Sequence, residues 1–265
     1  MNNKPYIRFL PLLMPGAGLL GGILWALMMR LCVDERGLLK AWNLPHILLL
    51  LLAAGALVAA ILLTRGLGGS NRYSHNFHPS LGAGISSFAA AGGIAWMLLG
   101  NLRGSRDILA SLWMVLGILC IPALVMAGIS RIRGKRPHCL LYAVVSLFFG
   151  IHMAHQYRFW SSNPLLAEYA YTLFACVFLT LFAYCLTAFS AGMGRRLRCL
   201  TAGLLAAFFA MVSAFQPDAG LFYPLCGIWA ALNLCDMQPR PRKAKPQAEA
   251  PAPEETPAGP KEEHV

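Results

Sequence analysis

Long stretches without a charged residue alternate along this chain with short segments that carry charge. Scanned for Asp, Glu, Lys and Arg, the sequence has eight uncharged windows, at residues 9–29, 41–64, 73–102, 108–130, 137–157, 169–194, 199–217 and 219–235. A helix that crosses the hydrocarbon of a bilayer needs about 20 apolar residues, and each window reaches or approaches that length. The pattern predicts an all-α fold, a bundle of eight transmembrane helices within residues 1–237.

Composition supports a membrane bundle with short loops. Hydrophobic residues make up 57% of the chain and charged residues 12%, with a mean hydropathy of +0.57. Lys4 and Arg8 precede the first window, as in a signal peptide. That window is longer than the apolar core of about 7–15 residues in a signal peptide, so we expect a retained first helix.

The net charge of +11 indicates the orientation of the helices in the membrane and does not indicate nucleic-acid binding. Basic residues gather on the cytoplasmic side of membrane proteins. With eight helices, one side of the membrane carries 16 Lys and Arg and the other carries 6. Both termini are therefore predicted to be cytoplasmic. The last two windows are short and separated only by a turn at residues 216–220, which leaves a re-entrant hairpin as the alternative there.

The last segment, residues 238–265, changes character. Four basic residues come first, and a stretch rich in Pro, Ala and Glu follows with almost nothing to bury, so we expect a disordered cytoplasmic tail. The basic residues would attract anionic lipid or act as a plain stop-transfer anchor; they are Arg240, Arg242, Lys243 and Lys245.

Small residues and prolines mark expected packing sites. Gly18 and Gly22 form a small-xxx-small pair in the first helix, and the third carries small residues on one face: Gly82, Ser86, Ala89 or Ala90, and Gly93. Pro122 and Pro224 lie inside predicted helices, where proline kinks the backbone.

One predicted helix, residues 169–194, has a regular polar stripe. Its members step by three or four residues: Tyr169, Thr172, Cys176, Thr180, Tyr184 and Thr187. A lipid-facing stripe would be apolar, so this one is predicted to face protein or water. It is either a packing seam with bonded hydroxyl groups or a polar path that lines a cavity.

Ionisable residues gather near the outer ends of several helices. His152 and His155 lie one turn apart, with Arg158 beyond them, and Glu168 begins the next helix at the same predicted level. Two histidines and a carboxylate can form an outward-facing ligand site that binds a divalent metal or relays protons. The alternative is interfacial histidines, with Arg158 paired to Glu168. A carboxylate beside the pair would favour protonated histidine and a response to pH near about 6–7.

No motif names a reaction. The eight cysteines show no C-x-x-C spacing, and no phosphate-binding loop, nucleophile elbow or histidine metal motif occurs. We therefore expect no catalytic residues, metal or cofactor. Non-enzymatic function as a sensor or accessory membrane subunit, with a possible membrane partner subunit, ranks ahead of a small-molecule or ion transporter.

The segment Tyr157-Arg158-Phe159-Trp160-Ser161-Ser162-Asn163-Pro164 is distinctive, as are Glu168-Tyr169, Thr172-Leu173-Phe174-Ala175 and Gly194-Arg195-Arg196. Residues 155–200 resemble a group of uncharacterised polytopic membrane proteins of anaerobic Gram-positive bacteria. That resemblance implies a bacterial plasma membrane and carries no known activity.

Overall fold

The computed structural model describes residues 9–32, 43–65, 72–101, 107–160, 169–216 and 220–237. Within these ranges the chain is helical apart from turns, short connections and one isolated antiparallel bridge between Phe77 and Met237. The predicted tail, residues 238–265, lies outside the described residues, as do its four basic side chains and Glu168.

Seven of the described helices are long and apolar enough to cross a membrane. They are α1 (Leu10–Leu31), α2 (Leu44–Thr64), α4 (Leu81–Gly100), α5 (Ile108–Ile132), α6 (Cys139–Trp160), α7 (Ala170–Ala191) and α8 (Arg196–Ser213). The eighth apolar helix, α9 (Phe222–Cys235), has only 14 residues. At about 1.5 Å per residue it extends roughly 21 Å, less than the hydrocarbon thickness of about 30 Å. Length and composition thus support seven of the eight predicted spans, and the last helix is a shorter one.

The third predicted window, residues 73–102, is two elements. It begins with the four-residue helix α3 (Tyr73–Asn76), and α4 starts only at Leu81. Pro79 lies between them. Proline has no backbone N–H, so inside a helix it would remove a backbone hydrogen bond. The side chain of Ser80 then accepts a hydrogen bond from the backbone N–H of Ala83 (3.3 Å) and caps the new helix. A proline and a cap therefore set the true start of this span.

Pro224 does not kink a helix, which corrects the sequence prediction. Because α9 begins at Phe222, Pro224 falls in its first turn, where a backbone N–H has no partner within the helix. Pro122, in contrast, lies inside α5.

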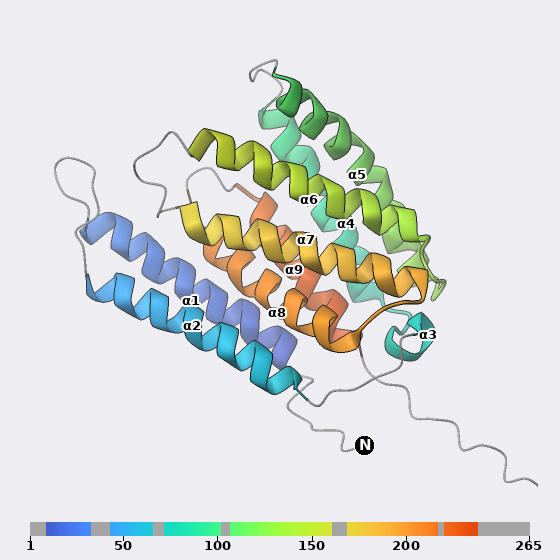
Figure 1. Ribbon diagram of the computed structural model, residues 1–265, viewed down its shortest axis with the longest axis horizontal. Coiled ribbons are helices and arrows are strands. Elements are labelled where there is room, and N and C mark those ends of the chain that lie inside the picture. Colours follow the sequence, from blue (N-terminus) through green and yellow to red (C-terminus); the bar gives the residue numbers. More distant parts are fainter. Residues whose placement is uncertain are drawn as a thin grey trace, which may run out of the picture.

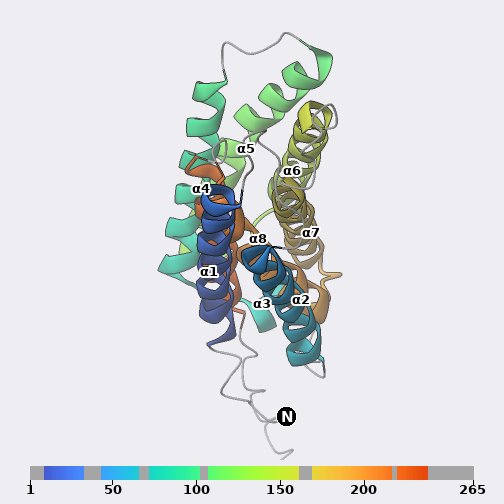
Figure 2. The same cartoon turned by 90° about the vertical axis from the view of Figure 1, so that its left-hand side faces the viewer.

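The helices run alternately up and down, with α8 and α9 at the centre (Figure 1). α8 contacts α1, α2, α7 and α9, and α9 also contacts α4. The α1–α2 pair lies on one side of this centre and α4 to α7 on the other, as the turned view also shows (Figure 2). We call the end of the bundle that carries α3 the α3 end, and the other the opposite end.

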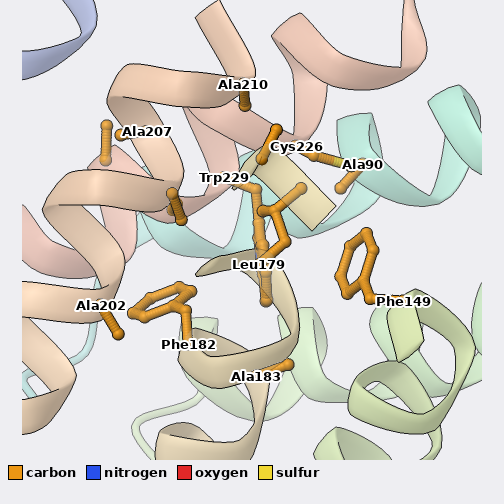
Figure 3. Packing of buried hydrophobic residues seen from close by; sticks show 14 of the residues in the cluster. Ala90, Phe149, Leu179, Phe182, Ala183, Ala202, Ala207, Ala210, Cys226 and Trp229 are labelled. Carbon is orange, nitrogen blue, oxygen red and sulfur yellow. The ribbon is translucent and has the colours of Figure 1, made fainter. Parts of the chain in front are cut away.

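The centre of the core is built from aromatic rings set against small residues. Trp229 of α9 is fully buried, with ring centroids of Phe149 and Phe182 at 6.3 and 5.3 Å (Figure 3). α8 presents Ala202, Ala207 and Ala210 to this cluster, so the helices approach closely. Close packing of small residues is the main source of helix association in lipid.

The predicted glycine pair is a packing seam between α1 and α8. A Cβ atom on Gly18 would lie 2.5 Å from the carbonyl oxygen of Phe208, and one on Gly22 would meet the ring of Phe215. On α4, Ser86, Ala90 and Gly93 are buried as predicted. Gly82 is not part of that seam. Gly84, which lies against Gly128 and Ile132 of α5, takes its place.

Candidate functional site

His152 lies in the interior of the bundle, with both ring nitrogens bonded to neighbouring helices. It is fully buried. The indole Nε1–H of Trp113 on α5 donates to its Nδ1 (2.9 Å), and its Nε2 contacts the hydroxyl oxygen of Tyr223 on α9 (3.2 Å). Phe222 packs edge-on against the imidazole, with ring centroids 5.0 Å apart. His152 is therefore held among aromatic rings and faces α5 and α9.

These contacts fix the protonation of His152. An indole nitrogen can only donate, so Nδ1 of His152 must be an acceptor and carries no proton. The ring is therefore neutral with its hydrogen on Nε2, which donates to the Tyr223 oxygen. A protonated imidazole would place N–H against N–H at Trp113, so the arrangement selects the neutral form.

The bonded series continues to α7 through Cys176. The Tyr223 hydroxyl lies 3.4 Å from the sulfur of Cys176. Since that hydroxyl accepts from His152, its own hydrogen is available to the sulfur, and each group donates to the next in one direction. We call these four residues, Trp113, His152, Tyr223 and Cys176, the His152 line. It joins α5, α6, α9 and α7 near the level where α9 begins.

The polar stripe of α7 is mostly satisfied within the protein. Thr172 is buried and hydrogen-bonds to Gln216, which follows α8. Thr180 and Thr187 donate to the carbonyl oxygens of Cys176 and Ala183, one turn earlier on their own helix (2.7 and 3.0 Å).

Two tyrosines of the predicted stripe lie apart from these contacts. Tyr184 is 63% exposed and lies on the outer surface. Tyr169 stacks on Trp160, with ring centroids 4.6 Å apart, at the opposite end of the bundle. The stripe is therefore divided between the interior and the surface.

Of the other residues of the predicted outer site, His155 and Arg158 are described and have partners on α5 or at its start. The ring of His155 stacks on Trp113, with centroids 4.9 Å apart and planes at 9°. Arg158 forms an exposed ion pair with Asp107, the residue that caps α5. The pair with Glu168 that the sequence suggested lies outside the described residues. The structure brings His152 and Cys176 to a common partner, Tyr223. It does not place His152 at an outward-facing surface.

The His152 line is suited to holding helices together and not to moving protons. Trp113 at one end is a donor that does not release its hydrogen at ordinary pH, and Cys176 at the other end is fully buried. Buried polar groups that are fully hydrogen-bonded make one packing of the core unique. We found no group of three or more potential metal ligands in the described part of the chain.

A second polar centre, which the sequence did not indicate, lies at the α3 end. Arg131 of α5 is only 2% exposed. Its guanidinium donates to the Tyr73 hydroxyl and to a carboxylate oxygen of Asp236 (both 3.1 Å), and it lies 4.6 Å from the centroid of the Phe77 ring. We call these four residues the Arg131 cluster.

The Arg131 cluster ties α3 to the end of α9. Phe77 pairs with Met237 through the isolated bridge, and Arg196 of α8 donates to the carbonyl oxygen of Met237 (3.2 Å). Burial raises the pKa of Asp236, and Ser80, Arg131 and His78 oppose that shift. Burial also raises the pKa of Tyr73 above its usual value, although the charge of Arg131 opposes it.

Sequence reasoning missed Trp113, Tyr223 and Arg131 for different reasons. Trp113 and Tyr223 are 39 and 71 residues from His152, so no local pattern joins them. Arg131 directly follows an uncharged window, so the sequence alone predicts a loop charge there. The sequence does contain a signal for this pair, because Asp236 directly follows the last uncharged window.

Comparison with known proteins returned no match, whether the chain was set against protein-family models, curated proteins or solved structures. The described helices define the class: an all-helical protein whose apolar helices suit a multi-pass membrane location.

Proposed function

We propose that this is a non-enzymatic multi-pass protein of a bacterial plasma membrane, a sensor or an accessory subunit. The observation that supports this is the closure of the α7 stripe. The hydroxyl of Thr172 is hydrogen-bonded to Gln216, and those of Thr180 and Thr187 donate to carbonyl oxygens of α7 itself. Polar groups that are already paired in this way build a seam, whereas a transport path needs groups that are open to water.

The His152 line supports the same proposal. Ion pumps and proton-coupled carriers place ionisable groups on their pathway. Here Trp113 keeps His152 neutral, and the thiol of Cys176 at the end of the line is buried. The line contributes rigidity between four helices, which suits a subunit that transmits a change of shape or supports a partner.

Thiol labelling distinguishes a seam from a path. In a background with all native cysteines replaced by serine or alanine, single cysteines at Thr172 and Thr180 should resist a membrane-impermeant maleimide applied to both sides of the membrane. Met193, 77% exposed in the turn after α7, is the positive control, and Tyr184 is the lipid-facing control. Rapid labelling at Thr180 would contradict the proposal and favour a transporter.

We further propose that the α3 end faces the cytoplasm. Among the described residues, seven exposed basic side chains lie at that end: Arg65, Arg72, Arg133, Lys135, Arg136, Arg195 and Arg198. Arg30 and Arg158 are the exposed basic residues described at the opposite end, so the distribution follows the positive-inside rule.

Reporter fusions test this orientation. Fusions after Gly134 and Gly194 should report the cytoplasm, and fusions after Gly104 and Ser162 the outside. A cytoplasmic signal from Ser162 would reverse the assignment or change the number of spans.

A further inference from the structure

His155 lies flat against the ring that begins the His152 line. Its imidazole stacks on the indole of Trp113, with ring centroids 4.9 Å apart and planes at 9°. The same indole, which is only 3% exposed, donates its Nε1–H to Nδ1 of His152 (2.9 Å). One histidine therefore contacts the face of this indole, and the other accepts its hydrogen bond.

The two histidines differ in whether they can take up a proton. A proton on Nδ1 of His152 would face the N–H of Trp113. His155 is half-buried and lies one turn nearer the opposite end, and Arg158, one turn further along α6, is 62% exposed. Water therefore reaches this part of the helix. Because histidine changes its charge between about pH 5 and 8, acid at the opposite end can charge His155 while His152 stays neutral.

The charged side chains near His155, among the described residues, come from two helices. They are Arg158 on its own helix and Asp107 at the start of α5, and they form an ion pair with each other. The guanidinium repels an added proton and the carboxylate attracts it. Since the pair as a whole is neutral, the charge of His155 can follow the pH of the water at this end.

A charged His155 acts on Trp113 through the face of the indole. A cation within about 6 Å of an aromatic centroid is attracted by the ring electrons, most strongly for tryptophan. This contact draws electron density from the indole, so its N–H becomes a stronger donor to His152. Groups in a hydrogen-bonded series polarise one another, and the bond from His152 to Tyr223 is strengthened in turn.

We propose that His155 is a proton-binding site through which acid at the opposite end strengthens the His152 line. The imidazole takes up one proton from water, and the proton stays there, because Trp113 does not pass it on. The stimulus is acid outside the membrane, and the response is a firmer connection between α5, α6, α9 and α7. This inference rests on the sensor form of the proposed function and on its orientation, and it names the signal that is sensed.

Nitrogen-15 NMR of the full-length protein in lipid vesicles tests the proposal. The histidine rings and the tryptophan indole nitrogens carry the label, and spectra are recorded from about pH 8 to about pH 5. The histidine signal that His155→Gln removes should change from the neutral to the protonated form. The indole signal that Trp113→Phe removes should move downfield with the same midpoint, and the His152 signal should keep its neutral form.

Three variants isolate the contact. In His155→Gln, the Trp113 signal should no longer follow the pH. His155→Phe keeps a ring against Trp113 without a titrating nitrogen and should give the same loss, so either variant decides the question. His46→Gln removes another half-buried histidine, near the start of α2 at the same end, and should leave the Trp113 titration unchanged. Circular dichroism in the same vesicles checks that each variant is folded.

A Trp113 signal that stays still while His155 titrates would overturn the proposal, as would a His155 that stays neutral over the whole range. Movement of the Trp113 signal that persists in His155→Gln or His155→Phe would do the same. Thiol labelling at Thr180 tests the proposed function separately. Rapid labelling there would remove the sensor role and leave the proton site standing, whereas a static Trp113 signal would remove the proton response and leave the seam.

Discussion

The His152 line and the Arg131 cluster both place polar side chains in an apolar bundle, and they do so by opposite means. The line contains no charge, and each group donates to the next across four helices. The cluster contains a full positive charge that arginine cannot lose, balanced by Asp236 and by the oxygen and ring of its neighbours. In the line, the His152 ring packs against Phe148 and Phe222. The cluster lies where α5 and α9 end.

This difference follows from the cost of desolvation. A neutral group that is fully hydrogen-bonded can be placed deep in the core at little cost, whereas a charge costs several kcal/mol even when it is paired, of order 1–4 kcal/mol more than an apolar replacement in some proteins. Charge is therefore expected near helix ends, and neutral bonds in the interior. The predictions that follow break each centre in turn, in order of decreasing effect.

The largest effect is expected from breaking the buried ion pair. Asp236→Leu leaves Arg131 buried with its charge uncompensated, and should lower the free energy of unfolding by about 3–5 kcal/mol. Arg131→Met combined with Asp236→Leu removes both charges and should recover most of that loss. The measurement is unfolding by a denaturing detergent, followed by tryptophan fluorescence. A double variant no more stable than Asp236→Leu would show that the pair has another role.

A smaller effect is expected from opening the His152 line. Trp113→Phe removes the donor to His152 Nδ1 and leaves a buried acceptor without a partner, which should cost about 1–3 kcal/mol. Tyr223→Phe interrupts the line at its centre and should cost a similar amount. Trp96→Phe, at a site 62% exposed, is the matched control and should change little. Equal losses at Trp113 and Trp96 would mean that ring size, and not the hydrogen bond, matters.

Alkaline pH should weaken the protein partly through Tyr73. Because burial raises the pKa of Tyr73 in the folded state, its contribution to stability is complete below the unfolded value of about 10. It is lost as the pH rises through the folded value, since the unfolded chain then releases the proton more readily. Tyr73→Phe should therefore show a shallower fall in unfolding free energy above about pH 10. Parallel curves for the wild type and the variant would contradict this.

The smallest effect is expected from the exposed ion pair. Asp107→Asn should change the unfolding free energy by about 0–1 kcal/mol, because water and salt screen a surface pair. Asp107 and Arg158 are 41% and 62% exposed, against 16% and 2% for Asp236 and Arg131. The comparison with Asp236→Leu thus isolates the effect of burial. A loss as large as that of Asp236→Leu would show that exposure does not govern these pairs.

Much of the fold could be predicted from the sequence because the signal is local. Runs of uncharged residues place seven long helices, and a glycine pair marks the face of α1 that packs, although not its partner α8. Two boundaries failed for local reasons as well. Pro79 and Ser80 move the start of α4, and the late start of α9 puts Pro224 in its first turn. An uncharged window shows only that a segment lacks Asp, Glu, Lys and Arg. It does not show at which residue helical hydrogen bonding begins.

The polar centres could be predicted only in part because their contacts are distant in sequence. His152 was singled out for its neighbour His155, one turn along the same helix, yet its bonding partners are Trp113 and Tyr223 on other helices. Cys176 was placed in a stripe with Thr180, and it belongs with Tyr223. Periodicity shows which residues share a face of one helix, but the partner of each face is decided by packing between helices.

The separation of Arg131 and Asp236 also has a consequence during synthesis. The two residues are 105 positions apart, and a ribosome adds about 5–20 residues per second. A nascent chain therefore carries Arg131 for roughly 5–20 s before its counter-charge exists. During that interval the end of α5 must stay in contact with water, lipid headgroups or the insertion machinery. A chain that terminates before Asp236 lacks the counter-charge, so this ion pair can form only after the last helix has been translated.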